Sequence, residues 1–73
     1  MNLKPTQKAV LKVLVDNEDK WICHDELCRL SGVASNHVKN AVTFFMNNDY
    51  VYQPNYNGEI MVSPDGISAY YSS

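Results

Sequence analysis

Residues 26–42, "ELCRLSGVASNHVKNAV", contain two helix-like segments separated by a short turn. The first has leucines three residues apart and the second has valines four residues apart, so the apolar side chains of each segment share one helical face. Gly32 lies between the segments, where the left-handed backbone that ends many helices favours glycine. The stretch therefore predicts a helix over 24–30, a turn over 31–33 and a helix over about 35–48.

The segment before this stretch predicts another helix. Residues 5–17, "PTQKAVLKVLVDN", begin with Pro5, which is favoured at the first helical position because the N–H it lacks would have no partner there. Apolar residues recur at Val10, Leu11 and Leu14, a spacing that places them on one helical face. We therefore expect a helix that packs this face against the other two.

The segment after the stretch predicts a β-hairpin and a short last helix. Residues 50–53 and 59–62 have strand-forming composition, and Asn57-Gly58 between them is a strong signal for a two-residue turn. The residues "WIC" at 21–23 would add a third strand and cover one edge of the hairpin. The final "SPDGISAYY" predicts a helix, because serine, proline and aspartate in this order favour a helix start.

The size and composition of the chain indicate one small folded domain over residues 1–73. This length leaves no room for a second core, and 45% apolar with 19% charged residues is typical of a folded chain. No apolar run approaches the roughly 18 residues of a membrane span, and no signal-peptide pattern begins the chain. We therefore expect a cytoplasmic protein without a membrane partner.

The cysteines and histidines form no recognisable catalytic or metal-binding motif. Cys23 and Cys28 are too few for a disulfide framework, and with His24 and His37 they lack the paired short spacing of a zinc site. The sequence has no nucleophile–base pairing and no glycine loop that would cradle a phosphate. We therefore expect reduced cysteines, no metal, no cofactor and no enzymatic activity.

The order of these elements resembles the winged helix-turn-helix family over about residues 3–71. The resemblance is carried by Glu26-Leu27, by a turn glycine followed by an aliphatic residue, and by inward valines in the next helix. It implies an α+β fold, in which a three-helix bundle carries a short three-stranded antiparallel sheet, or wing, and a short C-terminal helix. The expected core residues are Val10, Leu14, Leu27, Leu30, Val33, Val38, Val42 and Phe45.

The resemblance also implies a sequence-specific DNA-binding transcriptional regulator of the small bacterial or phage repressor type. The helix at 35–48 would enter the major groove of double-stranded DNA, where asparagine can pair with adenine, lysine with guanine, and threonine with the thymine methyl group. Ser35 or Ala34 begins this helix; Ser35 is the better N-cap and also suits a phosphate. The candidate DNA-binding residues are Ser35, Asn36, His37, Lys39, Asn40, Thr43, Asn55, Tyr56, Asn57 and Lys8.

The charge balance supports a second hypothesis, a protein-interaction module that does not bind DNA strongly. The net charge is −2, and from Ser35 to Ser63 the only cation is Lys39, against Asp49 and Glu59. DNA affinity comes largely from phosphate neutralisation, which such a composition does not favour. The polar residues of the helix at 35–48 would then form an ordinary solvated face.

The sequence allows two roles for each of three aromatic residues. Tyr70 and Tyr71 end the last helix, and they can either pack within the chain or form a homodimer contact, as the terminal helices of related folds often do. Phe44 lies off the core face of its helix. It can pack beneath the terminal helix or mark a surface for a protein partner.

Overall fold

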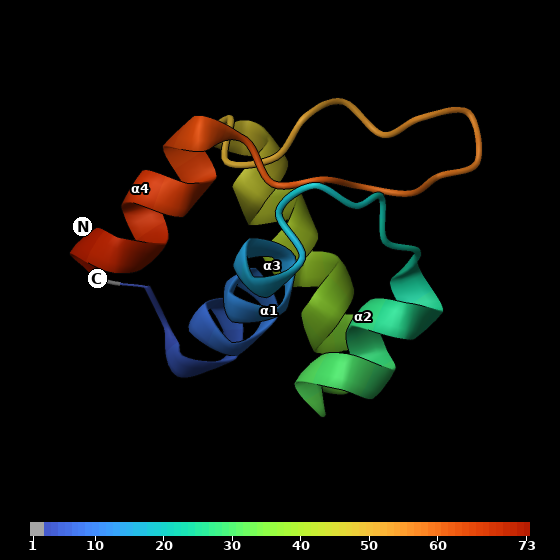
Figure 1. Cartoon of the computed structure of the whole chain (residues 1–73). Coiled ribbons are helices and arrows are strands. Elements are labelled where there is room, and N and C mark those ends of the chain that lie inside the picture. Colours follow the sequence, from blue (N-terminus) through green and yellow to red (C-terminus); the bar gives the residue numbers. More distant parts are fainter. Residues whose placement is uncertain (1–2) are drawn as a thin grey trace.

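The computed structural model describes residues 3–73 and contains four helices (Figure 1). They are α1 (Pro5–Asp16), α2 (His24–Ser31), α3 (Ser35–Asn47) and α4 (Pro64–Ser72). Helix α1 packs against each of the other three, and α2 also packs against α3. The four predicted helices are confirmed, with boundaries that differ by about a residue, which is the usual uncertainty at helix ends.

The helix ends follow local sequence signals at three of four expected positions. Pro5 begins α1, Gly32 ends α2 in the left-handed conformation with φ 69°, and Ser63 caps α4 by accepting a hydrogen bond from the backbone N–H of Gly66. The predicted N-cap of α3 is wrong. Ala34 occupies the cap position without a side-chain hydrogen bond, and Ser35 is the first helical residue.

The predicted three-stranded sheet is wrong, and with it the α+β fold class. Over the described part of the chain the extended pairing consists of two isolated antiparallel bridges, Ile22 with Ile60 and Val51 with Val62. Ile22 and Ile60 exchange both backbone hydrogen bonds, with N···O distances of 2.8 and 2.9 Å. The fold of residues 3–73 is therefore a small all-helical domain.

Two local features explain why the bridges do not extend into strands. The segment that pairs through Ile22 is enclosed between a turn and the start of α2 at His24, so it offers too few residues for a ladder. On the other side, Pro54 follows shortly after Val51 and has no N–H to donate. The segments at 21–23, 50–53 and 59–62 therefore have strand-forming residues, but too few of their backbone groups can pair to form strands.

The hairpin loop turns around different residues from those expected. The backbone N–H of Gly58 donates to the carbonyl of Asn55 at 2.9 Å, so Tyr56 and Asn57 lie at the centre of the turn. Gly58 follows with φ 77°, a left-handed conformation typical of three-residue hairpin loops. This loop crosses the upper side of the molecule in Figure 1.

The core lies where the four helices and the two bridges meet. The prediction that Leu30 belongs to the core is wrong, because this side chain is 46% exposed. Val33 and Val42, also expected in the core, are half-buried against it. The buried hydrophobic residues are Val10, Leu11, Val13, Leu14, Val15, Ile22, Leu27, Val38, Ala41, Phe45, Val51, Ile60 and Val62. The two β-bridges thus supply core side chains although they form no sheet.

Helix α4 docks tightly on the backbone that follows α3. A Cβ atom added to Gly66 would lie 2.0 Å from the carbonyl oxygen of Tyr50, which is far inside van der Waals contact. Ser63 Oγ donates to the carbonyl oxygen of Asp49 at 2.7 Å, and the side chain of Ile67 packs partly buried against the core. The absence of a side chain at residue 66 therefore permits this approach.

Candidate nucleic-acid interface

Helices α2 and α3 form a helix-turn-helix pair, with Gly32–Ala34 as the turn. The backbone N–H of Gly32 donates to the Cys28 carbonyl at 3.0 Å. Ser31 Oγ donates to the Leu27 carbonyl at 2.6 Å and accepts from the Val33 backbone N–H at 3.2 Å. These bonds hold the turn in one conformation and so set how α3 is presented.

Helix α3 has one buried side and one exposed side. Val38, Ala41 and Phe45 are buried, which is the spacing of a single helical face. Every candidate DNA-binding residue that was predicted on this helix is exposed. These residues are Ser35, Asn36, His37, Lys39, Asn40 and Thr43.

Ser35 has an intramolecular contact that the sequence reasoning missed. Its hydroxyl is hydrogen-bonded to Nε2 of His24 at 2.7 Å, and the same nitrogen lies 3.5 Å from Sγ of Cys28. The first residues of α2 and α3 are therefore linked by side chains across the turn. The four-residue spacing of His24 and Cys28 on one helix is the sequence signal that indicates part of this cluster.

The start of α1 lies beside the start of α3 and shares a cavity of about 320 Å³ with it. Lys4, the N-cap residue of α1, lines this cavity together with Thr6 and Gln7 of α1, and His37 and Asn40 line it from α3. Each of these side chains can donate a hydrogen bond. Lys4, Thr6 and Gln7 were absent from the candidates, although Lys4 belongs to a row of lysines spaced four apart.

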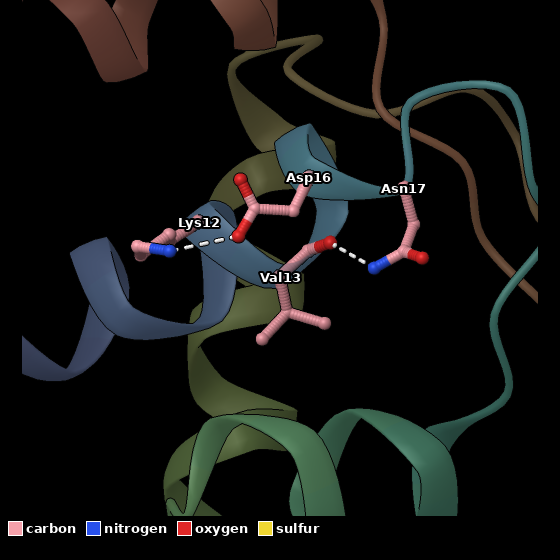
Figure 2. Close-up of polar contacts among 4 residues, drawn as sticks. All are labelled: Lys12, Val13, Asp16 and Asn17. Carbon is pink, nitrogen blue, oxygen red and sulfur yellow. Dashed lines mark hydrogen bonds and ion pairs between the residues drawn. The ribbon is translucent and has the colours of Figure 1, made fainter.

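The other two lysines of that row have partners within the chain. Lys8, a candidate DNA-binding residue, donates from Nζ to the backbone oxygen of Ser73 at 3.3 Å and lies 6.0 Å from the centre of the Tyr70 ring. Lys12 forms a 2.8 Å ion pair with Asp16, as Figure 2 shows. Lys8 therefore faces α4, and Lys4 is the lysine of this row that lines the cavity beside α3.

The hairpin tip uses one of its candidate residues to hold its own shape. Oδ1 of Asn55 accepts hydrogen bonds from the backbone N–H groups of Asn57 and Glu59, both at 3.0 Å. Its Nδ2 donates to a carboxylate oxygen of Glu59 at 3.1 Å. Asn55 is thereby engaged inside the loop, whereas Tyr56 is 98% exposed and Asn57 is exposed.

Phe44 packs within the chain. Its ring makes edge contacts with Phe45 and Tyr50, with centroids 6.2 and 6.1 Å apart, and it is half-buried against the core. These contacts support packing of Phe44 within the chain, with the partners Phe45 and Tyr50 and not residues of the terminal helix. A surface for a protein partner would then have to be formed by other aromatic side chains.

Charges are separated along the molecule in a way that the net charge conceals. No acidic residue occurs between Leu3 and Val15 or between Leu30 and Asn48, and these ranges include most of α1 and all of α3. The starts of α1 and α3 lie together on the lower side of Figure 1 with the end of α2, whereas the hairpin loop lies on the upper side. The candidate surface therefore lies within the acid-free parts of an acidic protein, and it includes Lys4 and Lys39.

Neither a metal centre nor a membrane span emerges from residues 3–73. These residues include no group of three or more His, Cys, Asp or Glu side chains placed to hold a metal ion, and Cys23 and Cys28 are free thiols. No described helix has the length and apolar character needed to cross a bilayer. No protein-family model, curated protein or solved structure matches this chain.

Proposed function

We propose that this protein is a sequence-specific DNA-binding transcriptional regulator that inserts α3 into the major groove. One observation carries the proposal: the outer face of α3 is an exposed row of amide, hydroxyl and basic side chains without a carboxylate. Its partner helix α2 and the fixed turn at Gly32 hold that face outward. Such a pair is the arrangement by which helix-turn-helix proteins read base edges.

The side chains of α3 match distinct features of the groove. Asn36 and Asn40 can each pair with an adenine through two hydrogen bonds, and Lys39 can donate to the acceptors of guanine. Thr43 donates its hydroxyl to the Lys39 carbonyl at 3.0 Å, which leaves its methyl group for contact with thymine. Lys4, beside Asn40, would contact a flanking phosphate.

The regulator would act as a homodimer that uses α4. Tyr71 is 73% exposed, and its ring contacts that of Tyr70 at a centroid distance of 5.2 Å. Tyr70 is half-buried against the core, so it fixes the position of the exposed ring. Two copies would double the phosphate contacts and compensate for the few cations of one chain.

A selection from randomised duplex DNA, followed by fluorescence anisotropy over a series of salt concentrations, tests the proposal. Each phosphate contact adds about −0.9 to the slope of log K against log salt, so a dimer should show about twice the slope of a monomer. A chain that enriches no sequence and shows no binding at low salt would overturn the proposal.

Matched charge removals locate the interface. Lys39→Gln should weaken binding to the selected site by about tenfold or more, because in the proposed complex this lysine would face the bases. Lys20→Gln removes the same charge from the turn before α2 and should change affinity less than about twofold. Asn40→Ala should weaken the selected site more than random DNA. Equal effects of the two lysine substitutions would place the interface elsewhere.

A second candidate, a protein-interaction module, is favoured by the hairpin. Tyr56 is almost completely exposed on a tip held by the Asn55 hydrogen bonds, and rigidly held tyrosines are common anchors in protein interfaces. Val42 and Pro54 line an apolar hollow of about 250 Å³ between α2, α3 and this loop. A partner captured by the native protein should be lost with Tyr56→Ala and kept with Tyr71→Ala.

A further inference from the structure

A hollow of the described surface lies away from the exposed start of α3. It has a volume of about 440 Å³ and lies between the end of α3, the segment that follows it and the start of α4. Met46, Tyr52, Pro54 and Pro64 form an apolar wall along it. Met46 is 39% exposed and Tyr52 is 46% exposed, so this wall is open to a ligand.

The charged side chains that line this hollow are all acidic. Asp49 and Asp65 line it, and no lysine, arginine or histidine does. The ion pairs of residues 3–73 are formed by other groups, Lys12 with Asp16 and Arg29 with Glu26, so neither carboxylate here is neutralised by the described chain. The partial negative charge at the end of α3 and the partial positive charge at the start of α4 oppose each other here, so the two carboxylates set the charge of the hollow.

We propose that this hollow docks an arginine-bearing segment of a partner protein. A guanidinium group can stack on the Tyr52 ring while it donates hydrogen bonds to a carboxylate, a combination that a lysine ammonium does not reproduce. Apolar neighbours of that arginine would pack against Met46 and Pro64. The carboxylates and the partner's arginine are complementary in charge, and the apolar wall excludes water from their contact.

The docking hollow is independent of the proposed DNA contacts. Helix α3 has 13 residues, so its two ends are about 20 Å apart. A partner held at the end of the helix would leave the exposed residues near Ser35 free. The inference therefore stands or fails separately from the proposed function.

Three synthetic peptides test the inference on the complete native chain. They are N-acetyl-Leu-Arg-Leu-amide, its lysine analogue and its citrulline analogue, which keeps the shape of arginine without the charge. In a titration followed by ¹H–¹⁵N correlation spectra, the arginine peptide should shift the amide signals of residues 46–54 and 63–66. The citrulline peptide should bind about tenfold more weakly or worse, and the lysine peptide between the two.

Two matched substitutions identify the carboxylates. Asp65 and Asp25 both lie in the first turn of a helix, so Asp65→Asn and Asp25→Asn remove the same charge from equivalent positions. Asp65→Asn should weaken the arginine peptide about fivefold, with Asp25→Asn within about twofold of the native protein. Asp49→Asn should act like Asp65→Asn, since asparagine tolerates the positive φ of 59° at this position.

Several results would overturn the inference. Equal binding of the arginine and citrulline peptides would exclude charge recognition, and peptide shifts scattered over the surface would exclude a built site. If Asp65→Asn and Asp25→Asn weakened binding of the arginine peptide equally, the affinity would depend on the net charge of the protein and not on this hollow. Signals of the hollow that change with protein concentration, and that the peptide does not displace, would identify a second copy of the chain as the occupant instead.

Discussion

Replacing Gly66 by alanine should destabilise the protein, although the same change in an exposed helix is stabilising. Alanine is favoured over glycine by about 1 kcal/mol within a helix. Here the new methyl carbon would lie 2.0 Å from the Tyr50 carbonyl oxygen and 2.7 Å from a methyl group of Val62. The oxygen belongs to the backbone, so the contact cannot be relieved by a side-chain rotation.

The size of the effect follows from the movement that the methyl group requires. A carbon–oxygen contact of about 3.3 Å needs α4 to move by roughly 1.3 Å at this point. Overpacking of this kind costs about 1–3 kcal/mol, and the shift would expose part of Ile67 and Tyr70, which adds about 2 kcal/mol. After subtraction of the helix preference, we expect a loss of about 3 kcal/mol in the free energy of unfolding.

Urea denaturation followed by circular dichroism measures this loss directly. A domain of this size has a total stability of about 4–11 kcal/mol, and a loss of about 3 kcal/mol corresponds to a decrease in Tm of roughly 12–24 °C. Ser68→Ala, at an exposed position of the same helix, should change the stability by less than about 0.5 kcal/mol. A Gly66→Ala protein as stable as the native one would refute the close approach of α4 to Tyr50.

Three further predictions concern the cap, the core and a surface ion pair. Ser63→Ala removes both the cap of α4 and the bond to the Asp49 carbonyl and should cost about 2 kcal/mol in a urea titration. Phe45→Ala should cost about 3–5 kcal/mol and Leu30→Ala less than about 1 kcal/mol, because the first side chain is buried and the second is half-exposed. The hydrogen bond and charge of Asp16 raise the pKa of Lys12 above 10.5, so the pair stabilises the fold below that pH and loses its effect as the pH rises through the raised pKa. The stability difference between the native protein and Lys12→Gln should therefore be smaller near pH 12 than near pH 8, and a difference independent of pH would exclude the pair.

The helices were predictable because each has strong local signals. Pro5 and Ser63 mark helix starts, Gly32 marks a helix end, and apolar residues recur at helical spacing between them. These signals depend on residues within one or two turns of each other. The same reasoning placed the exposed side of α3 correctly, because its opposite side contains the buried Val38 and Phe45.

The sheet was not predictable, because a ladder depends on how many residues of two distant segments can pair. Ile22 and Ile60 do meet, as expected for strands, yet the pairing stops after one bridge. Burial also depends on distant neighbours. Leu30 has the helical spacing of a core residue but remains 46% exposed, whereas Ile22 reaches the core through its bridge.

The roles of individual polar residues in the candidate site were the least predictable. Sequence alone treats Lys4, Lys8 and Lys12 alike, but each faces a different neighbour: α3, α4 and Asp16 respectively. The Asn55 side chain could bind a ligand, but it instead accepts hydrogen bonds from backbone N–H groups of its own turn. Such assignments follow from tertiary contacts that local spacing does not encode.

The separation of charge along the molecule affects how it approaches another polyelectrolyte. The residues from Leu3 to Val15 and from Leu30 to Asn48 include lysines and no carboxylates, so the charges are unevenly distributed although the total charge is small. In the field of a polyanion the molecule would rotate these acid-free parts forward before the surfaces touch, so a larger share of encounters would be productive. The association rate can therefore exceed the value that the overall charge of −2 suggests.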